Sequence, residues 1–413
     1  MAAETVDTAA AAAVRPGSVR VHVRAALRRA APALGLFAAI RLTGVLCTAL
    51  WAWHTGRHPR NLLGTTWDSN WYLSVARYGY GSSSPLHMWP TDPDADLAFF
   101  PLYPGLIRGV SAVLPVGAPD AGLLLAWTAA AVAAWGIFAV GAHLYGRRAG
   151  TFLVALWALL PHAVVESLSY TEPLLTALAA WALYALLTDR PLWAGALAVL
   201  AGLARPNGLA VAAAVVAVAS VRTWAAAVRT WQRGPGRDGL VPRQAARPLW
   251  RYWAAALTAP AGWFGYVLWV GAQTGAGPRG YFQVQAIWGS RFDFGRDTLR
   301  SVKRLFLYNE PLVQHMAAAV VAVAVLLFVL LVLDRPPLPL LVYTVVLLAM
   351  ALGGTGYFPS KPRFLLPAFP LLVPAAVALA RARPRAVVLA TGSLAALSLG
   401  YGVYLLAMAP LPL

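Results

Sequence analysis

The chain has 413 residues, of which 60% are hydrophobic and only 12% are charged, and its mean hydropathy is +0.63. A soluble globular chain is roughly 45–50% apolar and about 25% charged, so this composition excludes soluble enzymes, disordered regulators, coiled coils and DNA-binding domains. The single cysteine, Cys47, excludes a disulfide framework and any cysteine-based zinc or iron–sulfur site. These features predict a polytopic membrane protein.

Eleven apolar stretches are candidates for membrane-spanning helices, since a span needs about 20 mostly apolar residues. Several are short, which predicts tilted, broken or incompletely inserted helices. We expect residues 1–32 to form a basic cytoplasmic segment, disordered at its start, and residues 33–413 to form one all-α transmembrane domain. The candidate spans are residues 33–53, 121–145, 149–165, 171–188, 191–204, 207–221, 252–271, 313–333, 338–352, 363–380 and 386–409.

The net charge of +18 follows the positive-inside rule if the N-terminus is cytoplasmic. The inner segments then hold 19 basic and 5 acidic residues, most of the basic ones in the N-terminal segment and the loop 222–251. The outer segments hold 13 basic and 10 acidic residues, mainly in the loops 54–120 and 272–312, while Arg41 lies inside the first span. The charge is therefore a topology signal that requires no nucleic acid. The outward carboxylates predict a functional surface on the outer face.

The first outer loop contains a carboxylate, Asp68, surrounded by aromatic residues in WDSNWYLSVARYGY. Trp71, Val75 and Tyr78 have helical spacing, which predicts a short helix lying in the membrane interface. One interpretation is an aromatic belt at the headgroup level. The other is a carbohydrate site, in which flat rings such as Trp67 stack on the sugar and Asp68 acts as a base.

The same loop contains Asp92, Asp94 and Asp96 at a spacing of two residues. Carboxylate oxygens at this spacing can hold a divalent cation. The pattern is also common in solvated loops, and we predict no metal site from it.

Two further motifs place charged residues beside apolar spans. The turn ESLSYTEP carries Glu166 and Glu172, and the sequence ARPNG carries Arg205, which is a candidate partner because carboxylates near membrane depth usually have one. The set forms either a structural clamp or a substrate contact. In GYFPSKPRFLLPAFP, Lys361 and Arg363 oppose the positive-inside trend. They indicate either a phosphate ligand or cations that extend to lipid headgroups.

The outer loop 272–312 adds polar and aromatic side chains without a recognisable motif. They are Gln283, Gln285, Trp288, Arg291, Asp293 and Arg304, with His315 just beyond the loop.

Five motifs occur in a characteristic order, namely WDSNWYLSVARYGY, FFPLYPGLIR, SLSYTEPLLTALAAWALYAL, ARPNGLAVA and KPRFLLPAFPLL. In this order they resemble the PIG-V-like mannosyltransferases, the family of GPI mannosyltransferase 2 and its bacterial relatives, over about residues 33–380. A composition rich in alanine and arginine with only two lysines suggests a GC-rich bacterium. The eukaryotic acceptor therefore does not carry over, and we expect a multi-pass protein of the bacterial plasma membrane.

The resemblance implies a GT-C fold of about 11 transmembrane helices with an outward catalytic loop. It also implies transfer of a sugar, usually mannose, from a polyprenyl-phosphate donor to a glycolipid, polysaccharide or protein acceptor. No metal or other cofactor is expected. In this chain Asp68 matches the catalytic carboxylate, and the expected substrate-binding residues are Trp67, Trp71, Tyr72, Glu166, Glu172, Arg205, Lys361 and Arg363.

Two alternatives remain at this point. Buried charges and broken helices also mark the substrate pathways of transporters and lipid flippases, although no internal repeat is evident. The chain could also be a non-catalytic membrane partner of a glycosylation complex, with the loop around Asp68 as its contact surface.

Overall fold

A computed structural model describes residues 16–82, 90–233 and 249–409. These residues form helices and no β-strand, apart from one isolated bridge between Phe292 and Gly354. The α-helices are α1 (Pro16–His54), α2 (Pro59–Gly64), α3 (Asp68–Tyr78), α4 (Leu102–Val113), α5 (Ala118–Tyr145), α6 (Arg147–Ala158), α7 (Glu172–Leu187), α8 (Pro191–Ala204), α9 (Leu209–Arg233), α10 (Trp250–Thr258), α11 (Ala261–Gln273), α12 (Gly280–Ile287), α13 (Arg296–Leu307), α14 (Leu312–Leu333), α15 (Leu338–Gly353), α16 (Lys361–Phe364), α17 (Val373–Arg381) and α18 (Pro384–Ala407). Short 3-10 helices are η1 (Ala95–Ala98), η2 (Ala163–Ser167), η3 (Pro206–Gly208), η4 (Gly277–Arg279), η5 (Phe358–Ser360) and η6 (Phe369–Leu372).

The predicted all-helical membrane fold is confirmed, but the count of eleven spans is not. Five helices are long and apolar enough to cross a membrane, namely α1, α5, α9, α14 and α18. The segments Phe358–Phe364 and Phe369–Arg381 add a sixth if they form one span, which is bent by 79°. Helices α7, α8 and α15 are apolar but shorter. The expected span 252–271 divides into α10 and α11 around Pro260, which cannot donate a backbone hydrogen bond.

Two expected boundaries also differ from the structure. Helix α1 begins at Pro16, so part of the predicted N-terminal segment continues into the first span as helix. Helix α9 extends to Arg233 and so includes residues 222–233 of the predicted inner loop. The expected disorder at the chain start falls on residues 1–15, which lie outside the described residues.

Small residues let the central helices approach closely. A Cβ atom on Gly136 of α5 would lie 2.9 Å from Cβ of Ala180 in α7, and one on Gly141 would lie 2.8 Å from Cα of Gly150 in α6. Both distances are too short for real Cβ contacts. Because lipid provides little hydrophobic driving force between helices, such close packing is what holds them together in a membrane.

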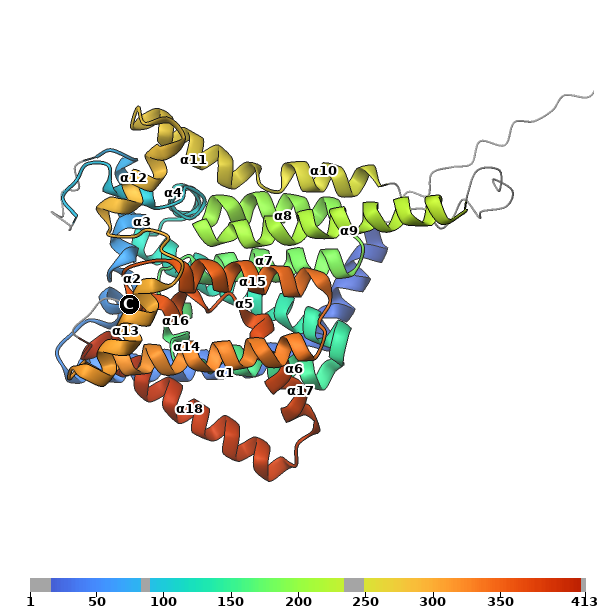
Figure 1. Cartoon of the computed structure of the whole chain (residues 1–413). Helices are drawn as coiled ribbons and strands as arrows, with labels where there is room; N and C mark the ends of the chain where they lie inside the picture. Colours follow the sequence, from blue (N-terminus) through green and yellow to red (C-terminus); the bar gives the residue numbers. More distant parts are fainter. Residues whose placement is uncertain (1–15, 83–89, 234–248, 410–413) are drawn as a thin grey trace, which may run out of the picture.

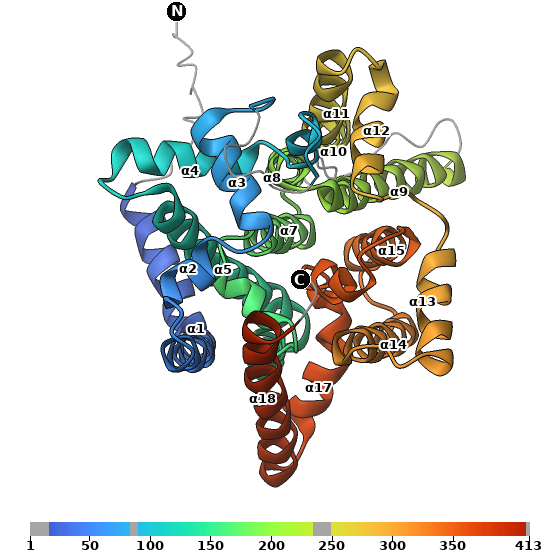
Figure 2. The same cartoon turned by 90° about the vertical axis from the view of Figure 1, so that its left-hand side faces the viewer.

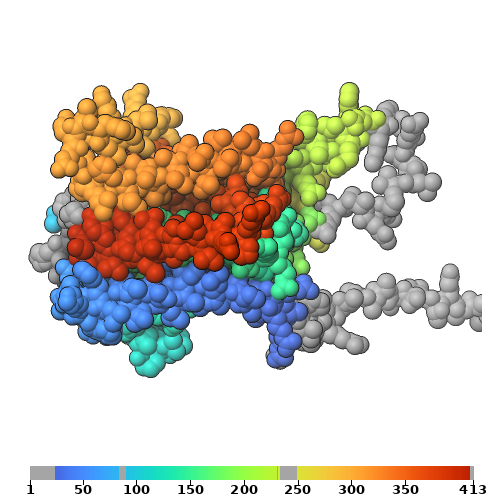
Figure 3. Space-filling view, turned by 90° about the horizontal axis from the view of Figure 1, so that it is seen from below, coloured from blue at the N-terminus to red at the C-terminus, as the bar shows by residue number. Residues whose placement is uncertain are grey.

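The two ends of the bundle differ in architecture and charge. At one end α3, α4, α12 and α13 run crosswise to the long helices, and both predicted outer loops meet there (Figures 1 and 2). The opposite end carries the ends of α9 and α10 (Figure 1). On one side of the bundle α18 fills the strip between α1 and α14 (Figure 3). The described arginines of the opposite end include Arg147, Arg190, Arg222, Arg335, Arg381, Arg383 and Arg385.

Candidate active site

A cavity of about 630 Å³ lies at the end of the bundle that carries the crosswise helices. This volume is within the range of small-molecule sites. Six separate stretches of sequence line it: the segment around Asp68, residues 98–100, the ARPNG motif, Trp263 of α11, the α12 region, and the segment from the end of α15 to Phe364. The predicted residues Trp67, Asp68, Trp71, Tyr72, Arg205, Lys361 and Arg363 all line the cavity.

Asp68 is the first residue of α3, and its side chain is 22% exposed. It is the sole carboxylate among the described residues that line the cavity. The preceding residue, Trp67, has a φ of 44° and a ψ of −117°. A non-glycine residue in this region carries a strain of roughly 1–3 kcal/mol, and such strain is concentrated at functional sites. The surrounding fold therefore holds the carboxylate in a fixed position.

A chain of ion pairs connects Asp68 to the interior. Arg363 Nη2 lies 2.8 Å from Asp68 Oδ2, and Arg363 Nε lies 3.1 Å from Glu172 Oε1. Arg205 Nη1 lies 2.7 Å from the same Glu172 oxygen and donates to Thr171 Oγ1 at 2.8 Å. Nη1 of Arg363 has no hydrogen-bond partner among the described residues. Arg363 therefore brings a buried cation into the cavity wall and connects it to Glu172 behind the wall.

Lys361 is the first residue of α16, and its side chain reaches the C-terminal end of α15. Its Nζ donates to the carbonyl oxygens of Ala351 at 2.9 Å and Gly354 at 2.7 Å. The last carbonyls of a helix have no partner within the helix and attract cations. Lys361 is 2% exposed and Arg363 is 5% exposed, so the interpretation that they extend to lipid headgroups is wrong. Both belong to the cavity wall.

The aromatic residues of the first outer loop form another part of this wall. Trp71 stacks on Phe99 with ring centroids 5.6 Å apart, and Trp288 contacts Trp71 edge to face at 5.2 Å. Tyr72 shares a hydrogen bond of 3.0 Å with Thr171. Trp71 and Tyr72 are buried, so neither belongs to an aromatic belt. Burial raises the pKa of Tyr72 to about 12, so its phenol stays protonated.

The predicted helix around Trp71 exists as α3, but it is packed inside the protein instead of lying in the interface. Seven of its eleven residues are buried, from Ser69 to Ala76. Tyr78 at its end is 55% exposed. Only this last turn is available to the membrane surface.

Glu166 and Glu172 occupy different places. Glu172 does not line the cavity but lies behind it, between Arg205 and Arg363. Glu166 does not line it either, and its partner is Arg41 of α1, at 3.9 Å, instead of Arg205. Arg41 also donates to Ser167 Oγ at 2.9 Å. Both glutamates thus lie outside the cavity lining and pair with arginines, as the structural-clamp interpretation expects. The predicted substrate contact by Glu166 and Glu172 stays a prediction.

Several lining residues were not among the predicted site residues. Phe282, Gln285 and Trp288 follow one another at intervals of three on α12 and its end, and Asn207 belongs to the ARPNG motif. This helical spacing is a signal that could have identified the α12 face. Further unpredicted polar lining residues are Asn70, Tyr281, Ser290, Arg291, Thr355, Tyr357 and Ser360.

The three aspartates at spacing two hold their own loop together. Asp92 Oδ1 accepts a hydrogen bond from the Asp94 amide at 2.9 Å, and Asp96 Oδ2 accepts one from the Gly81 amide at 2.9 Å. Burial raises the pKa of Asp96 to about 6. Among the described residues, no group of three or more His, Cys, Asp or Glu side chains could hold a metal ion.

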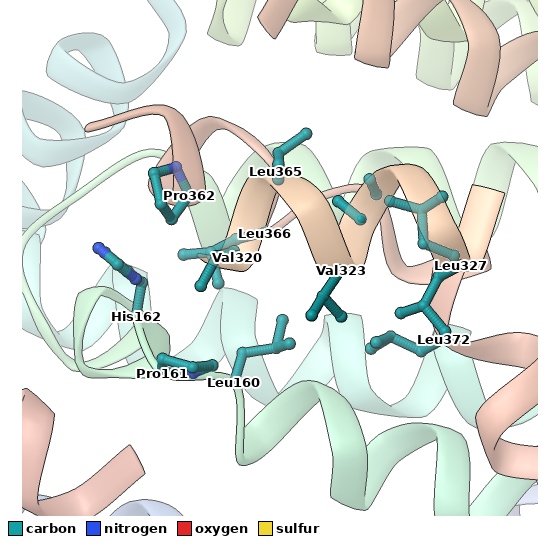
Figure 4. A pocket seen from close by; sticks show the side chains of 13 residues that line it. Leu160, Pro161, His162, Val320, Val323, Leu327, Pro362, Leu365, Leu366 and Leu372 are labelled. Atoms are coloured by element: carbon teal, nitrogen blue, oxygen red, sulfur yellow. The ribbon is translucent and has the colours of Figure 1, made fainter. Parts of the chain in front are cut away.

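A second cavity, of about 60 Å³, lies between residues 160–162, helix α14 and residues 362–372 (Figure 4). Its walls are leucine, valine, alanine and proline side chains, with His162 as its polar member. It is too small and too apolar for a sugar.

No protein-family model and no curated protein sequence matches the chain. Among solved structures, the fold is similar to that of ArnT from Cupriavidus metallidurans bound to undecaprenyl phosphate, with a TM-score of 0.50 and 13% sequence identity. The match covers 90% of this chain and 62% of ArnT, so the chain spans less than two thirds of that protein. At this identity the likeness shows the fold alone. The chain therefore has a helical, multi-pass membrane fold similar to that of ArnT, as its all-helical, apolar sequence predicts.

Proposed function

We propose that this protein is a membrane glycosyltransferase that moves a hexose, most readily mannose, from a polyprenyl-phosphate carrier to an acceptor hydroxyl with inversion. The observation that carries the proposal is the meeting of one carboxylate, Asp68, with Arg205, Lys361 and Arg363 in a single aromatic-walled cavity. The fold shared with ArnT, whose structure holds undecaprenyl phosphate, supports a lipid-linked donor. The resemblance of the motifs to PIG-V-like enzymes supports mannose.

The reaction needs a base on one side of the sugar and cations on the other. Asp68 takes the proton of the acceptor hydroxyl, and the hydroxyl oxygen forms a bond to C1 of the sugar. The bond from C1 to the phosphate oxygen breaks on the opposite face, and the electron pair leaves with the polyprenyl phosphate. The phosphate gains negative charge as this bond breaks, so fixed cations such as Arg205 and Lys361 stabilise the transition state more than the ground state.

The ion pair between Asp68 and Arg363 couples donor binding to the availability of the base. In the empty site Arg363 Nη2 lies 2.8 Å from Asp68 Oδ2 and occupies this carboxylate oxygen. A donor phosphate that contacts Arg363 would compete with Asp68 for the guanidinium. Asp68 would then be released to meet the acceptor hydroxyl when the donor is in place.

We propose that the cavity faces the outside of a bacterial plasma membrane, with the N-terminus in the cytoplasm. The end of the bundle opposite the cavity carries arginines with few carboxylates, whereas the cavity end carries both cations and most of the carboxylates. The positive-inside rule expects such an excess of positive charge at a cytoplasmic end. The acceptor is then a glycolipid, polysaccharide or protein hydroxyl that reaches the outer face.

A reconstituted transfer assay tests the proposed activity. Purified protein in liposomes receives polyprenyl phosphate carrying labelled mannose, with glucose and arabinose carriers in parallel, and a cell-envelope extract as acceptor. We expect labelled mannose in the extract, an equal amount of polyprenyl phosphate, and an inverted anomeric centre by NMR. Movement of intact donor across the bilayer without a new glycosidic bond would instead identify a flippase. A protein that shows neither transfer nor movement would be a non-catalytic partner.

A further inference from the structure

Helix α13 has an apolar face that no described part of the chain covers. Leu299, Val302 and Phe306 follow one another at intervals of three and four residues, so they lie on one side of the helix. Phe306 is 84% exposed and Leu299 is 72% exposed. Thr298 is the only buried residue of the helix. Contiguous exposed apolar side chains of this size mark a surface that binds a partner or a membrane.

Another face of α13 carries four cations. Arg296, Arg300, Lys303 and Arg304 recur at i, i+4, i+7 and i+8, and all four are exposed. Arg304 Nη2 lies 2.9 Å from Glu310 Oε1. No described acidic side chain forms an ion pair with the other three. The helix therefore separates apolar and basic residues, as helices that lie in a membrane interface do.

The position of α13 fits the surface of a bilayer. The helix runs crosswise to α14 and α15 at the end of the bundle (Figures 1 and 2). Thr298 Oγ1 donates to Leu352 O at 2.7 Å, and the Asp293 amide donates to Gly353 O at 2.9 Å. Asp297 Oδ2 accepts a bond from the Gly356 amide at 3.0 Å. These bonds fix the helix to the end of α15, and in Figure 3 the light-orange atoms of this region lie at the edge of the molecule.

We infer that α13 is a docking surface for anionic phospholipids of the surrounding bilayer. Leu299 and Phe306 enter the acyl boundary, while Arg300 and Lys303 contact lipid phosphates. The charges favour lipid over a protein partner. A row of cations, three of them without an ion pair among the described residues, lies beside an apolar row, and this pattern matches the layering of headgroups and acyl chains. This inference does not depend on the proposed transfer reaction.

The same bonds connect α13 to the cavity. Leu352 and Gly353, which anchor α13, lie between Ala351 and Gly354, whose carbonyl oxygens hold Lys361. A bilayer that binds α13 therefore also restrains the C-terminal end of α15, whose carbonyl oxygens hold Lys361.

Fluorescence quenching of a label on α13 tests whether this helix contacts lipid in the whole chain. A Cys47→Ala, Phe306→Cys variant carries an environment-sensitive fluorophore at position 306 and is placed in nanodiscs. Brominated phosphatidylglycerol or brominated phosphatidylcholine is added at equal mole fraction. We expect phosphatidylglycerol to quench the label at least about twofold more strongly, since each cation near the surface attracts anionic lipid.

Matched substitutions distinguish the effect of the α13 cations from that of cations elsewhere on the surface. Arg300→Gln with Lys303→Gln should remove the preference for phosphatidylglycerol, whereas Arg108→Gln, an exposed arginine on α4, should leave it unchanged. The inference is overturned if both lipids quench equally in the otherwise unaltered chain. It is also overturned if aqueous iodide quenches the label as strongly as the free dye, which would place α13 in water and favour a protein partner. Lipid quenching and iodide quenching are both measured in the labelled chain that keeps Arg300 and Lys303, so these two outcomes do not depend on whether the glutamine variant folds.

Discussion

Arg363 Nη2 lies 2.8 Å from Asp68 Oδ2, and the same guanidinium reaches Glu172 on its other side. One cation thus connects the carboxylate that faces the cavity with a carboxylate that is 1% exposed. Asp68 and Glu172 consequently have different surroundings, although each is the first residue of a helix. Asp68 is available to a substrate, whereas Glu172 fixes the cations around it.

Replacement of Asp68 by Asn should abolish transfer while leaving the protein folded and able to bind donor. A general base contributes about 10²–10⁴-fold to a rate, so we expect a loss within that range. The measurement is initial transfer rate at saturating donor. Asp92→Asn, which alters an exposed loop carboxylate, serves as the control and should retain full activity. Full transfer by Asp68→Asn would falsify its role as the base.

Replacement of Arg363 by Lys should weaken donor binding about tenfold, equivalent to about 1.4 kcal/mol. Lysine keeps the positive charge but cannot contact two carboxylates and a phosphate through separate nitrogens. Donor affinity measured by fluorescence quenching or calorimetry checks this expectation. Arg108→Lys, on the exposed side of α4, should leave the affinity unchanged. An unaltered affinity in Arg363→Lys would place the phosphate elsewhere.

Replacement of Glu172 by Gln should destabilise the fold by about 3 kcal/mol or more, because it leaves the buried Arg205 without a countercharge and Arg363 with Asp68 as its remaining one. Reversible unfolding in mixed detergent micelles measures the change. Glu310→Gln breaks an ion pair with the exposed Arg304 and should cost less than about 1 kcal/mol. If the two variants lose similar stability, the buried pairs do not hold the site together.

Stability should fall as the pH rises from about 4 to about 6 through the ionisation of Asp96. Its pKa is about 6 in the folded protein against 3.8 for the free side chain, chiefly because burial disfavours the charged form. The folded state therefore binds this proton more tightly, and its stabilising effect is present below pH 4 and lost above pH 6. The loss amounts to at most about 3 kcal/mol.

The Asp96→Asn variant isolates this contribution, since an amide oxygen can still accept the bond from Gly81. Melting temperatures of both proteins are compared between pH 4 and pH 7. We expect the difference between them to change across this window. A difference that is constant with pH would show that Asp96 does not titrate there.

The proposed orientation predicts opposite labelling at the two ends of the bundle. In a Cys47→Ala background, Tyr78→Cys should react with a membrane-impermeant maleimide on intact cells. Arg385→Cys, at an exposed position at the other end, should react only in inverted vesicles. The reverse pattern would place the cavity in the cytoplasm.

Sequence alone was sufficient for the helical membrane fold and for the separation of the two ends. Hydropathy and charge act locally along the chain, so apolar stretches and the loops between them can be read in order. The motif around Asp68 and the cations Arg205, Lys361 and Arg363 were found in the same way, because charged residues are rare in an apolar chain and carry a desolvation cost there.

The partners of these charges were decided by tertiary structure. Glu166 pairs with Arg41 while Glu172 pairs with Arg205 and Arg363, although the two glutamates belong to one short motif. Similarly, the carbonyl end of α15 both holds Lys361 and anchors α13. Sequence spacing does not specify such contacts, because they depend on how helices distant in the chain pack together. Charge and hydropathy thus determined which residues need a partner, and packing determined which partner each one has.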